Sequence, residues 1–333
     1  MIFVVLVFGV LLFSMLLVKA TDIVTDGLHD LAEKISVNAF GLTAFVLALA
    51  TSLPELFVGI TAAVHGNPEI SMGNVIGSNI ANLSLVLGGA ALVAGSVKAY
   101  DEFLSGEVFH TFLAGSLPLL LLIDGSLTRL DGVLLLVVYL LYNLTVLQER
   151  REEMVKSKKK QISWYRRLWF KIADKDVERS VGKLVIGVAL MIASADMLVR
   201  IAEQAAIRLN LPMALVGMVL VAIGTSLPEL SFGIAALKKK ETEMALGNIL
   251  GSVVANSTLI LGITALLSPF DLDGGLRSYL IATIAFVVVF GFFWVFVRSK
   301  KQLDRWEGLV LLLMYAVFVI FELVKIRSGL ALV

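Results

Sequence analysis

The chain has 333 residues, of which 58% are hydrophobic and only 17% are charged, and its mean hydropathy is +0.92. About a quarter of the residues in a soluble globular domain are charged, so this composition excludes an ordinary soluble protein. A net charge of +1 offers no basic face for nucleic acid, and the absence of cysteine excludes disulfides, thiolate metal sites and cysteine nucleophiles.

The apolar residues gather in blocks long enough to cross a hydrocarbon core about 30 Å thick as helices. They predict an all-α polytopic membrane protein with ten transmembrane helices. The approximate bounds are 2–19, 38–64, 70–95, 108–123, 130–147, 181–199, 212–237, 244–267, 278–297 and 306–324. Lys19 follows the first block and no basic segment precedes it, so we expect a retained helix and not a cleaved signal peptide.

The connections between these blocks carry very different numbers of basic residues. If the connections fall alternately on two sides, the side with segment 148–180 holds 22 of the 28 Lys and Arg residues. By the positive-inside rule, that side is cytoplasmic. We therefore expect a multi-pass protein of the cell membrane, with both termini extracellular and the 148–180 loop cytoplasmic.

Segment 148–180 is the one charged linker of the chain. On a helix, one face would carry Trp164, Tyr165, Leu168, Trp169 and Ile172, and the opposite face Arg166, Arg167 and Lys171. Such a pattern is typical of an amphipathic helix that lies on the cytoplasmic leaflet. The alternative is a basic tether that only enforces the orientation of the chain.

The sequence repeats itself at a fixed offset, so that Glu55 recurs as Glu229, 174 residues later. The peptide ATSLPE recurs as GTSLPE, and GNVIGSNIAN recurs as GNILGSVVAN at the same offset. Each copy covers about five spans, and an odd number inverts the second copy in the membrane. This predicts two inverted five-helix repeats, 1–147 and 181–333, with motifs at 48–82 and 222–256 and the 148–180 loop between them.

Glu55 and Glu229 are the only carboxylates deep within the apolar blocks. A charge at the centre of a bilayer costs at least about 2.5 kcal/mol, so a carboxylate there is a functional candidate. The alternative is a protonated glutamic acid that only makes an interhelical hydrogen bond. A glutamate occurs at the same position in both copies of the repeat, and this favours a functional role over the structural alternative.

Hydroxyl and amide groups lie one helical turn apart in both copies of the motifs, several on the same faces as the glutamates. They are Thr51, Ser52, Asn74, Ser78 and Asn82 in the first copy, and Thr225, Ser226, Asn248, Ser252 and Asn256 in the second. All can offer oxygen, and none offers thiolate or imidazole. Such a set suits a hard cation such as Ca²⁺ or Na⁺.

Proline and glycine in the motifs suggest how the helices are shaped. Pro54 and Pro228 have no N–H to donate, so we expect a kink whose freed carbonyls face the ion; a kink for packing alone is the alternative. The spacings Gly73/Gly77 and Gly247/Gly251 are GxxxG pairs, which favour close helix packing.

In these motifs the chain resembles the cation/Ca²⁺ exchanger superfamily, and specifically the prokaryotic sodium/calcium exchangers. The resemblance covers nearly the whole chain. It implies a secondary antiporter that exchanges cytoplasmic Ca²⁺ for external Na⁺ by alternating access around one midplane site. It also implies no enzymatic activity, no cofactor and no obligate protein partner, so that the transported ions and the lipid bilayer are the partners.

The resemblance also assigns roles to individual residues. Glu55 and Glu229 would be the main Ca²⁺ ligands, with Asn82 and Asn256 flanking them. Hydroxyl groups would line the Na⁺ subsites, namely those of Thr51, Ser52, Ser78, Thr225, Ser226 and Ser252. The backbone carbonyls of Ala48 and Ala222 match positions that contribute oxygens in the family.

The chain departs from the family pattern at the asparagines. Some Na⁺-coupled members have Asp in one repeat where this chain has Asn82 or Asn256, so here the two glutamates alone give a formal site charge of −2. That charge balances one Ca²⁺ but three Na⁺ poorly, and neighbouring desolvated carboxylates bind protons readily. Exchange of Ca²⁺ for H⁺ therefore stays open, as does, less favourably, a passive cation channel. Val253 and Val254 replace Asn79 and Ile80, which could make the half-sites unequal.

Overall fold

The computed structural model describes residues 2–35, 50–98, 106–156, 175–271 and 279–327. In the first half the elements are α1 (Ile2–Ile35), α3 (Leu53–Val64), α4 (Pro68–Ala81), η1 (Asn82–Val86), α5 (Leu87–Ala94), β1 (Val97–Lys98), α7 (Glu107–Leu121), η2 (Leu122–Asp124), β2 (Ser126–Leu127) and α8 (Arg129–Lys156). In the second half they are α10 (Lys175–Leu209), α11 (Met213–Val216), η3 (Gly217–Val221), α12 (Ala222–Thr225), α13 (Leu227–Lys238), α14 (Thr242–Val254), η4 (Ala255–Ile260), α15 (Leu261–Leu267), β3 (Phe270–Asp271), α16 (Leu280–Lys300), β4 (Gln302–Leu303) and α17 (Arg305–Arg327).

Within these ranges, nine helical segments are long and apolar enough to cross a membrane, and α3 is a shorter apolar helix. They match the predicted spans, except that the span expected at 38–64 is described only from Ala50 onward. The mostly helical membrane fold predicted from the sequence is therefore confirmed. The amphipathic helix predicted at 164–172 lies outside the described residues.

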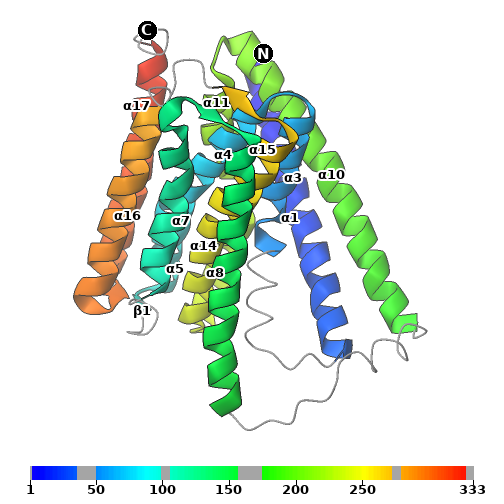
Figure 1. Cartoon of the computed structure of the whole chain (residues 1–333), viewed down its shortest axis with the longest axis vertical. Helices are drawn as coiled ribbons and strands as arrows, with labels where there is room; N and C mark the ends of the chain where they lie inside the picture. The colour runs from blue at the N-terminus through cyan, green and yellow to red at the C-terminus, as the bar shows by residue number, and fades with distance from the viewer. Residues whose placement is uncertain (1, 36–49, 99–105, 157–174, 272–278, 328–333) are drawn as a thin grey trace.

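Three helices run well past the apolar blocks that predicted them. α1 continues to Ile35, α8 continues to Lys156, and α10 covers Lys175–Leu209. The extensions are polar and contain no proline, so the helix continues although hydropathy no longer signals it. α10 ends where Asn210 takes a left-handed φ of 52° and Pro212 follows. The start of α1 and the end of α17 lie at the same end of the molecule, opposite the end of α8 (Figure 1).

α1 and α10 stand side by side along most of their length (Figure 1). Leu17 and Ala20 of α1 and Ala195 and Leu198 of α10 are fully buried in one apolar cluster, to which Val58 of α3 also belongs. A second, larger cluster holds the buried residues of α5, α7, α14, α16 and α17. The α1–α10 pair therefore has a hydrophobic core largely separate from that of the remaining helices.

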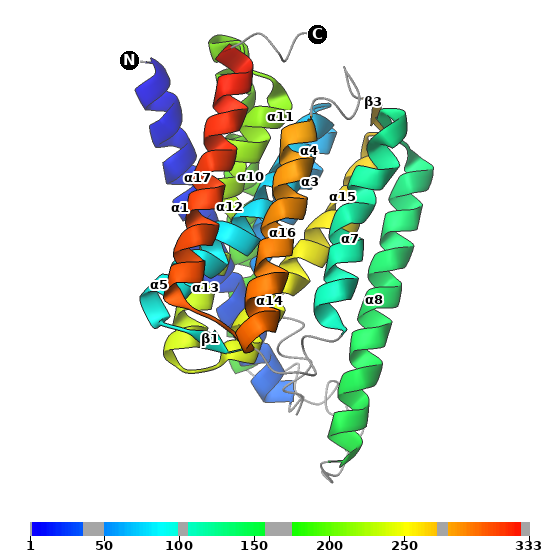
Figure 2. The same cartoon turned by 90° about the vertical axis from the view of Figure 1, so that its left-hand side faces the viewer.

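Two helices cross from one half of the chain to pack on the other. α8 packs along α15, and α17 packs along α5 (Figure 2 shows α17 beside α5). Both contacts are made by glycines: a Cβ added to Gly132 would lie 2.8 Å from the Gly262 carbonyl oxygen, and one added to Gly308 would lie 2.9 Å from that of Gly88. No real Cβ sits so close to an oxygen, so both crossings depend on glycine. Gly88 and Gly262 are 174 residues apart, at equivalent positions of the repeat.

Short antiparallel strand pairs make a third and a fourth contact between the halves. β1 pairs with β4, with Val97 opposite Leu303, and β2 pairs with β3, with Leu127 opposite Phe270. Each pair joins one strand before residue 156 to one after residue 175. The helices that follow β2 and β4 begin with similar caps, since Asp131 accepts a hydrogen bond from the Thr128 N–H (2.8 Å) and Glu307 from the Asp304 N–H (2.7 Å).

The predicted close packing of the GxxxG pair Gly73/Gly77 is present in α4. These glycines lie directly against backbone carbonyls, Gly73 against that of Ala214 and Gly77 against that of Met218. This contact brings α4 of the first half onto the segment that leads into the second motif. No described residue lies within 4 Å of a Cβ placed on Gly247, and residues 40 and 44, the counterparts of Ala214 and Met218, lie outside the described ranges.

Candidate ion-binding site

Two broken helices carry the membrane glutamates. α3 starts at Leu53 after a break at Ser52 (φ −86°, ψ 2°), and α13 starts at Leu227 after the same break at Ser226 (φ −84°, ψ 3°). The following proline causes both breaks because it has no N–H for the preceding turn. Glu55 and Glu229 therefore lie in the first turn of a new helix, where the helix dipole favours negative charge.

Both glutamates are completely buried, with 0% of the residue exposed. The carboxylates are close enough to repel each other, and the hydroxyls of Thr225 and Ser252 lie beside Glu55 and Glu229 respectively. None of the four carboxylate oxygens accepts a hydrogen bond of good geometry from a described residue. Burying a carboxylate without partners is costly, so this arrangement calls for a positive charge between the two groups.

Threonine hydroxyls link each half of the chain to an asparagine of the other half. Thr51 Oγ1 donates to Asn248 Oδ1 at 2.9 Å, and Thr225 Oγ1 donates to Asn74 Oδ1 at 3.1 Å. The two contacts are the same contact with the halves exchanged, since each residue of one pair is 174 residues from its counterpart in the other. The two motifs are therefore in direct contact across the halves of the chain.

The serine hydroxyls of the two motifs also make hydrogen bonds between the halves of the chain, but not symmetrically. Ser52 Oγ donates to Ser252 Oγ at 3.0 Å, while Ser78 Oγ lies 3.3 Å from Thr225 Oγ1. Ser226 Oγ, the counterpart of Ser52, has no hydrogen-bond partner in the part of the chain that is described. All four serines are buried.

Asn82 and Asn256 lie at the start of wide π-helical turns. Asn82 opens η1, and Asn256 is the second residue of η4. A π-turn widens the helix and leaves backbone groups without their usual partners, which is why such turns recur at functional sites. Asn256 Nδ2 donates to Asn79 Oδ1 at 3.2 Å, whereas its Oδ1 and both amide atoms of Asn82 have no partner within the described ranges.

Of the two predicted backbone ligands, only one lies in a described range. The carbonyl oxygen of Ala222 is buried and accepts from the Ser226 N–H at 3.0 Å, and Thr225 Oγ1 lies 3.4 Å from it. Ala48 lies outside the described residues. Eleven of the twelve predicted site residues are described and buried, and Ala48 is the one that lies outside the described ranges.

Comparison with known proteins identifies the family of the chain. The profile of the family described as sodium/calcium exchanger protein matches residues 5–148 and 179–324. The chain belongs to the sodium/calcium exchanger family. It is a transmembrane cation/Ca²⁺ antiporter, and the relatives that it resembles are transporters, not enzymes.

Individual relatives cover nearly the whole exchanger. It is 30% identical to the inner membrane protein YrbG of Escherichia coli over 84% of this chain and 86% of the relative. It is 27% identical to the sodium/calcium exchanger MaX1 of Methanosarcina acetivorans over 91% of this chain and 94% of the relative. A structure of the sodium-calcium exchanger NCX_Mj soaked with Na⁺ and Sr²⁺ superimposes with a TM-score of 0.64 at 27% identity, and covers 96% of this chain and 99% of that one.

The oxygens in the exchanger's site favour a hard cation. The described residues contain no group of three or more His, Cys, Asp or Glu side chains that could hold a metal by themselves. A bound cation would therefore be held by two carboxylates together with neutral hydroxyl, amide and carbonyl oxygens. This donor set suits ions that take many oxygen ligands, such as Ca²⁺.

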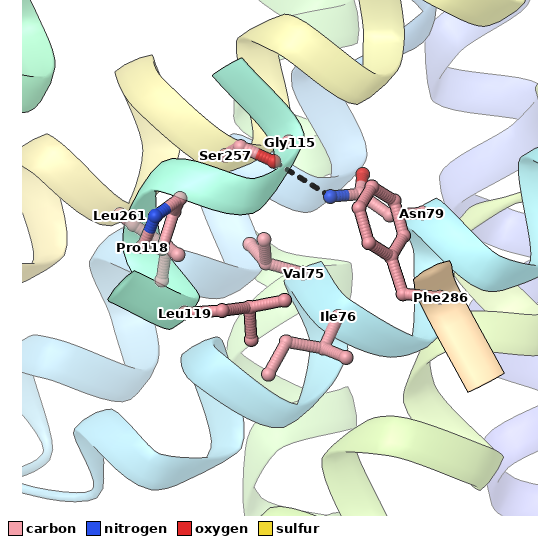
Figure 3. A pocket seen from close by; sticks show the side chains of 9 residues that line it. All are labelled: Val75, Ile76, Asn79, Gly115, Pro118, Leu119, Ser257, Leu261 and Phe286. Atoms are coloured by element: carbon pink, nitrogen blue, oxygen red, sulfur yellow. Dashed lines mark hydrogen bonds between the residues drawn. The ribbon is translucent and has the colours of Figure 1, made fainter. Parts of the chain in front are cut away.

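The sequence analysis assigned no site role to two polar residues, Asn79 and Ser257. Asn79 donates from Nδ2 to Ser257 Oγ at 2.7 Å, and together they border a cavity of about 10 Å³ between α4, α7, η4, α15 and α16 (Figure 3). The signal was visible in the repeat, because Asn79 is replaced by Val253 in the second copy. Ser14 of α1 was also missed; its buried hydroxyl lies directly against Gly224.

Proposed function

We propose that the protein exports Ca²⁺ from the cytoplasm in exchange for external Na⁺, by alternating access at a site between Glu55 and Glu229. The observation that carries the proposal is the pair of fully buried carboxylates, whose four oxygens have no partner among the described residues. Hydroxyl and amide oxygens from both halves of the chain surround them. A divalent cation would neutralise the formal charge of −2 and complete the site.

In the proposed site Glu55 and Glu229 are the principal Ca²⁺ ligands. Ca²⁺ takes six to eight oxygens at about 2.3–2.6 Å. Two bidentate glutamates and the carbonyls of Ala48 and Ala222 supply six, and Asn82, Asn256 or a water completes the shell. The hydroxyls of the motifs hold Na⁺ at overlapping positions, so the two ions compete. The full set comprises Thr51, Ser52, Ser78, Thr225, Ser226 and Ser252 with the six residues just named.

We infer that the two halves, 1–147 and 181–333, are inverted repeats joined by the 148–180 linker. The reciprocal contacts support this: Gly88 meets Gly308 and Gly262 meets Gly132, and each strand pair joins one half to the other. A two-fold axis in the membrane plane would generate such exchanged contacts. An odd number of spans in each half also agrees with the uneven distribution of basic residues, which orients both termini outward.

The separate packing of the α1–α10 pair supports alternating access. The proposed site residues lie on α3, α4 and α12–α14 and in the π-turns η1 and η4, and α3 and α4 carry buried residues of the α1–α10 cluster. Movement of one packed body against the other would open the site to one side of the membrane and close it to the other. Only a protein with Ca²⁺ or coupling ions bound at the site would switch between the states that open the site to one side of the membrane and to the other.

Exchange of Ca²⁺ for H⁺ is the second candidate, and the neutral amides favour it. Asn82 and Asn256 contribute no charge to the proposed site, so among its described residues only the two buried glutamates can balance cations. Two protons would balance them as well as one Ca²⁺. The residues of the site are the same for both candidates, and only the coupling ion differs.

The deciding experiment is ⁴⁵Ca²⁺ uptake by proteoliposomes loaded with Na⁺ and diluted into Na⁺-free buffer, with the pH clamped. We expect uptake that collapses when the Na⁺ gradient is removed. Uptake that ignores Na⁺ and follows an imposed pH gradient would establish H⁺ coupling instead. Ca²⁺ flux without any counter-flux would indicate a channel and would contradict both Na⁺/Ca²⁺ exchange and H⁺/Ca²⁺ exchange.

A further inference from the structure

The two site asparagines are not equivalent. Asn256 Nδ2 donates to Asn79 Oδ1 at 3.2 Å, while neither amide atom of Asn82 has a partner within the described ranges. The cause lies in the sequence: the position equivalent to Asn79 in the second repeat is Val253, which cannot accept a hydrogen bond. One asparagine amide is therefore held in place, and the other is not.

Asn79 is itself held by a second hydrogen bond. Its Nδ2 donates to Ser257 Oγ at 2.7 Å, and both residues are buried (Figure 3). Because the NH₂ group of Asn79 faces Ser257, its carbonyl oxygen faces Asn256. The position equivalent to Ser257 in the first repeat is Leu83, so this second link is also present on one side only.

The described side chains that line the cavity beside Asn79 include no polar partner for its amide except Ser257. A cavity of about 10 Å³, with room for about one water molecule, borders it. Asn79 and Ser257 supply the only polar side chains of its lining, and the others are Val75, Ile76, Pro118, Leu119, Leu261 and Phe286, with Gly115 adding none. An apolar residue at position 79 would suit this lining, so packing does not require asparagine.

We propose that Asn79 is a positioning residue that fixes the carbonyl oxygen of Asn256 toward the bound cation. An asparagine beside a cation must present oxygen, because its NH₂ group would repel the ion. Asn79 takes the NH₂ group of Asn256 and leaves Oδ1, which has no other partner among the described residues, for the ion. Asn256 is thus a fixed ligand and Asn82 an adjustable one. The inference rests on the proposed ion site, though not on which ion is coupled.

The test is a set of double-mutant cycles on the full-length protein, with ⁴⁵Ca²⁺ equilibrium binding measured in detergent and KM and maximal rate measured in proteoliposomes. Asn79→Val installs the residue of the other repeat and should weaken Ca²⁺ binding about 5- to 10-fold, raising KM while maximal rate changes by less than about twofold. Asn79→Asp keeps an oxygen that accepts a hydrogen bond from Asn256 Nδ2, so this variant should not show the loss of Ca²⁺ binding expected for Asn79→Val. Because Asn79 acts through Asn256, Asn79→Val should weaken Ca²⁺ binding no further when Asn256→Ala is already present. It should weaken Ca²⁺ binding by the full amount of about 5- to 10-fold when Asn82→Ala is present.

Equal effects of Asn79→Val in the two backgrounds would overturn the proposal, as would Asn79→Asp weakening binding as much as Asn79→Val. If Asn79→Val fails to fold, Ser257→Ala removes the anchor of Asn79 and should weaken binding in the same background-dependent way. The outcome is separable from that of the proposed function. Wild-type protein that binds Ca²⁺ but ignores Na⁺ overturns Na⁺ coupling and leaves the cycles interpretable; wild-type protein that binds no Ca²⁺ overturns both.

Discussion

Thr51 Oγ1 lies 2.9 Å from Asn248 Oδ1, although 197 residues separate them in the chain. Thr225 and Asn74 repeat this contact with the halves exchanged. Each bond joins the broken helix of one motif to the helix of the other motif, α14 or α4, that leads into a π-turn. The two motifs are thus hydrogen-bonded to each other across the halves of the chain, and the strength of these bonds can be measured.

Substitution of Thr51 and Asn248 by alanine should reveal direct coupling. A buried hydrogen bond contributes about 1 kcal/mol, so the double variant should be less destabilised than the sum of the single variants by about that amount. The measurement is the free energy of unfolding in mixed micelles. The mismatched pair Thr51→Ala with Asn74→Ala is the control and should be additive. Additivity in both pairs would show that the contact is energetically silent.

Glu55→Gln and Glu229→Gln should each nearly abolish Ca²⁺ transport without lowering the melting temperature of the ion-free protein. The amide keeps the shape of the side chain and removes a buried charge whose desolvation is costly. Transport is measured as ⁴⁵Ca²⁺ uptake, and stability by a thermal melt in a chelator. Glu243→Gln, at an exposed position of α14, is the matched control and should transport normally. Wild-type transport in either site variant would remove the site assignment.

Ca²⁺ should stabilise the folded protein, because an ion that binds only the folded state shifts the unfolding equilibrium. At a concentration about 100 times Kd the expected gain is about 2.7 kcal/mol, and a chelator should reverse it. The measurement is a thermal melt over a Ca²⁺ titration. The Glu55→Gln/Glu229→Gln double variant should show no shift. A shift of the same size in that variant would place the bound Ca²⁺ elsewhere.

Gly308→Ala should destabilise the protein by about 1–3 kcal/mol, because its Cβ would lie 2.9 Å from the Gly88 carbonyl oxygen and 3.0 Å from Ala91 Cβ. Gly291→Ala in α16 is the control: no described atom lies within 4 Å of the added Cβ, and alanine favours helix. It should leave stability unchanged or raise it. The measurement is unfolding in mixed micelles, and equal effects of both variants would contradict the crossing described here.

Much of the fold could be predicted because the local sequence indicates each transmembrane helix by an apolar block of sufficient length. The breaks at Ser52 and Ser226 could also be predicted, since Pro54 and Pro228 cause them within one turn. The helical extension of α8 to Lys156 could not, because hydropathy detects apolar blocks and not helices. Both glutamates could be recognised as candidate site residues because the repeat places a carboxylate, which is energetically unfavourable in the membrane, at the same position twice.

The cross-half contacts could not be derived from local sequence. The bond from Asn79 to Ser257 joins residues 178 positions apart, and only the arrangement of α4 against η4 brings them together. The π-turns at Asn82 and Asn256 have no established sequence signature in the chain. The sequence shows that Val253 stands where the second repeat would have a counterpart of Asn79. The consequence of this difference could be recognised only once the hydrogen-bond partners of Asn79 were known.

The crossing of α17 onto α5 has a consequence for biosynthesis. Gly88 lies in the first half of the chain, and the helix that covers it begins only at Arg305. When the ribosome has delivered the first half to the membrane, the glycine face of α5 has no protein neighbour and must be covered by lipid or by the insertion machinery. The nascent protein therefore cannot finish packing its first half until α17 has been inserted, and a ribosome stalled before Arg305 would leave that half incomplete.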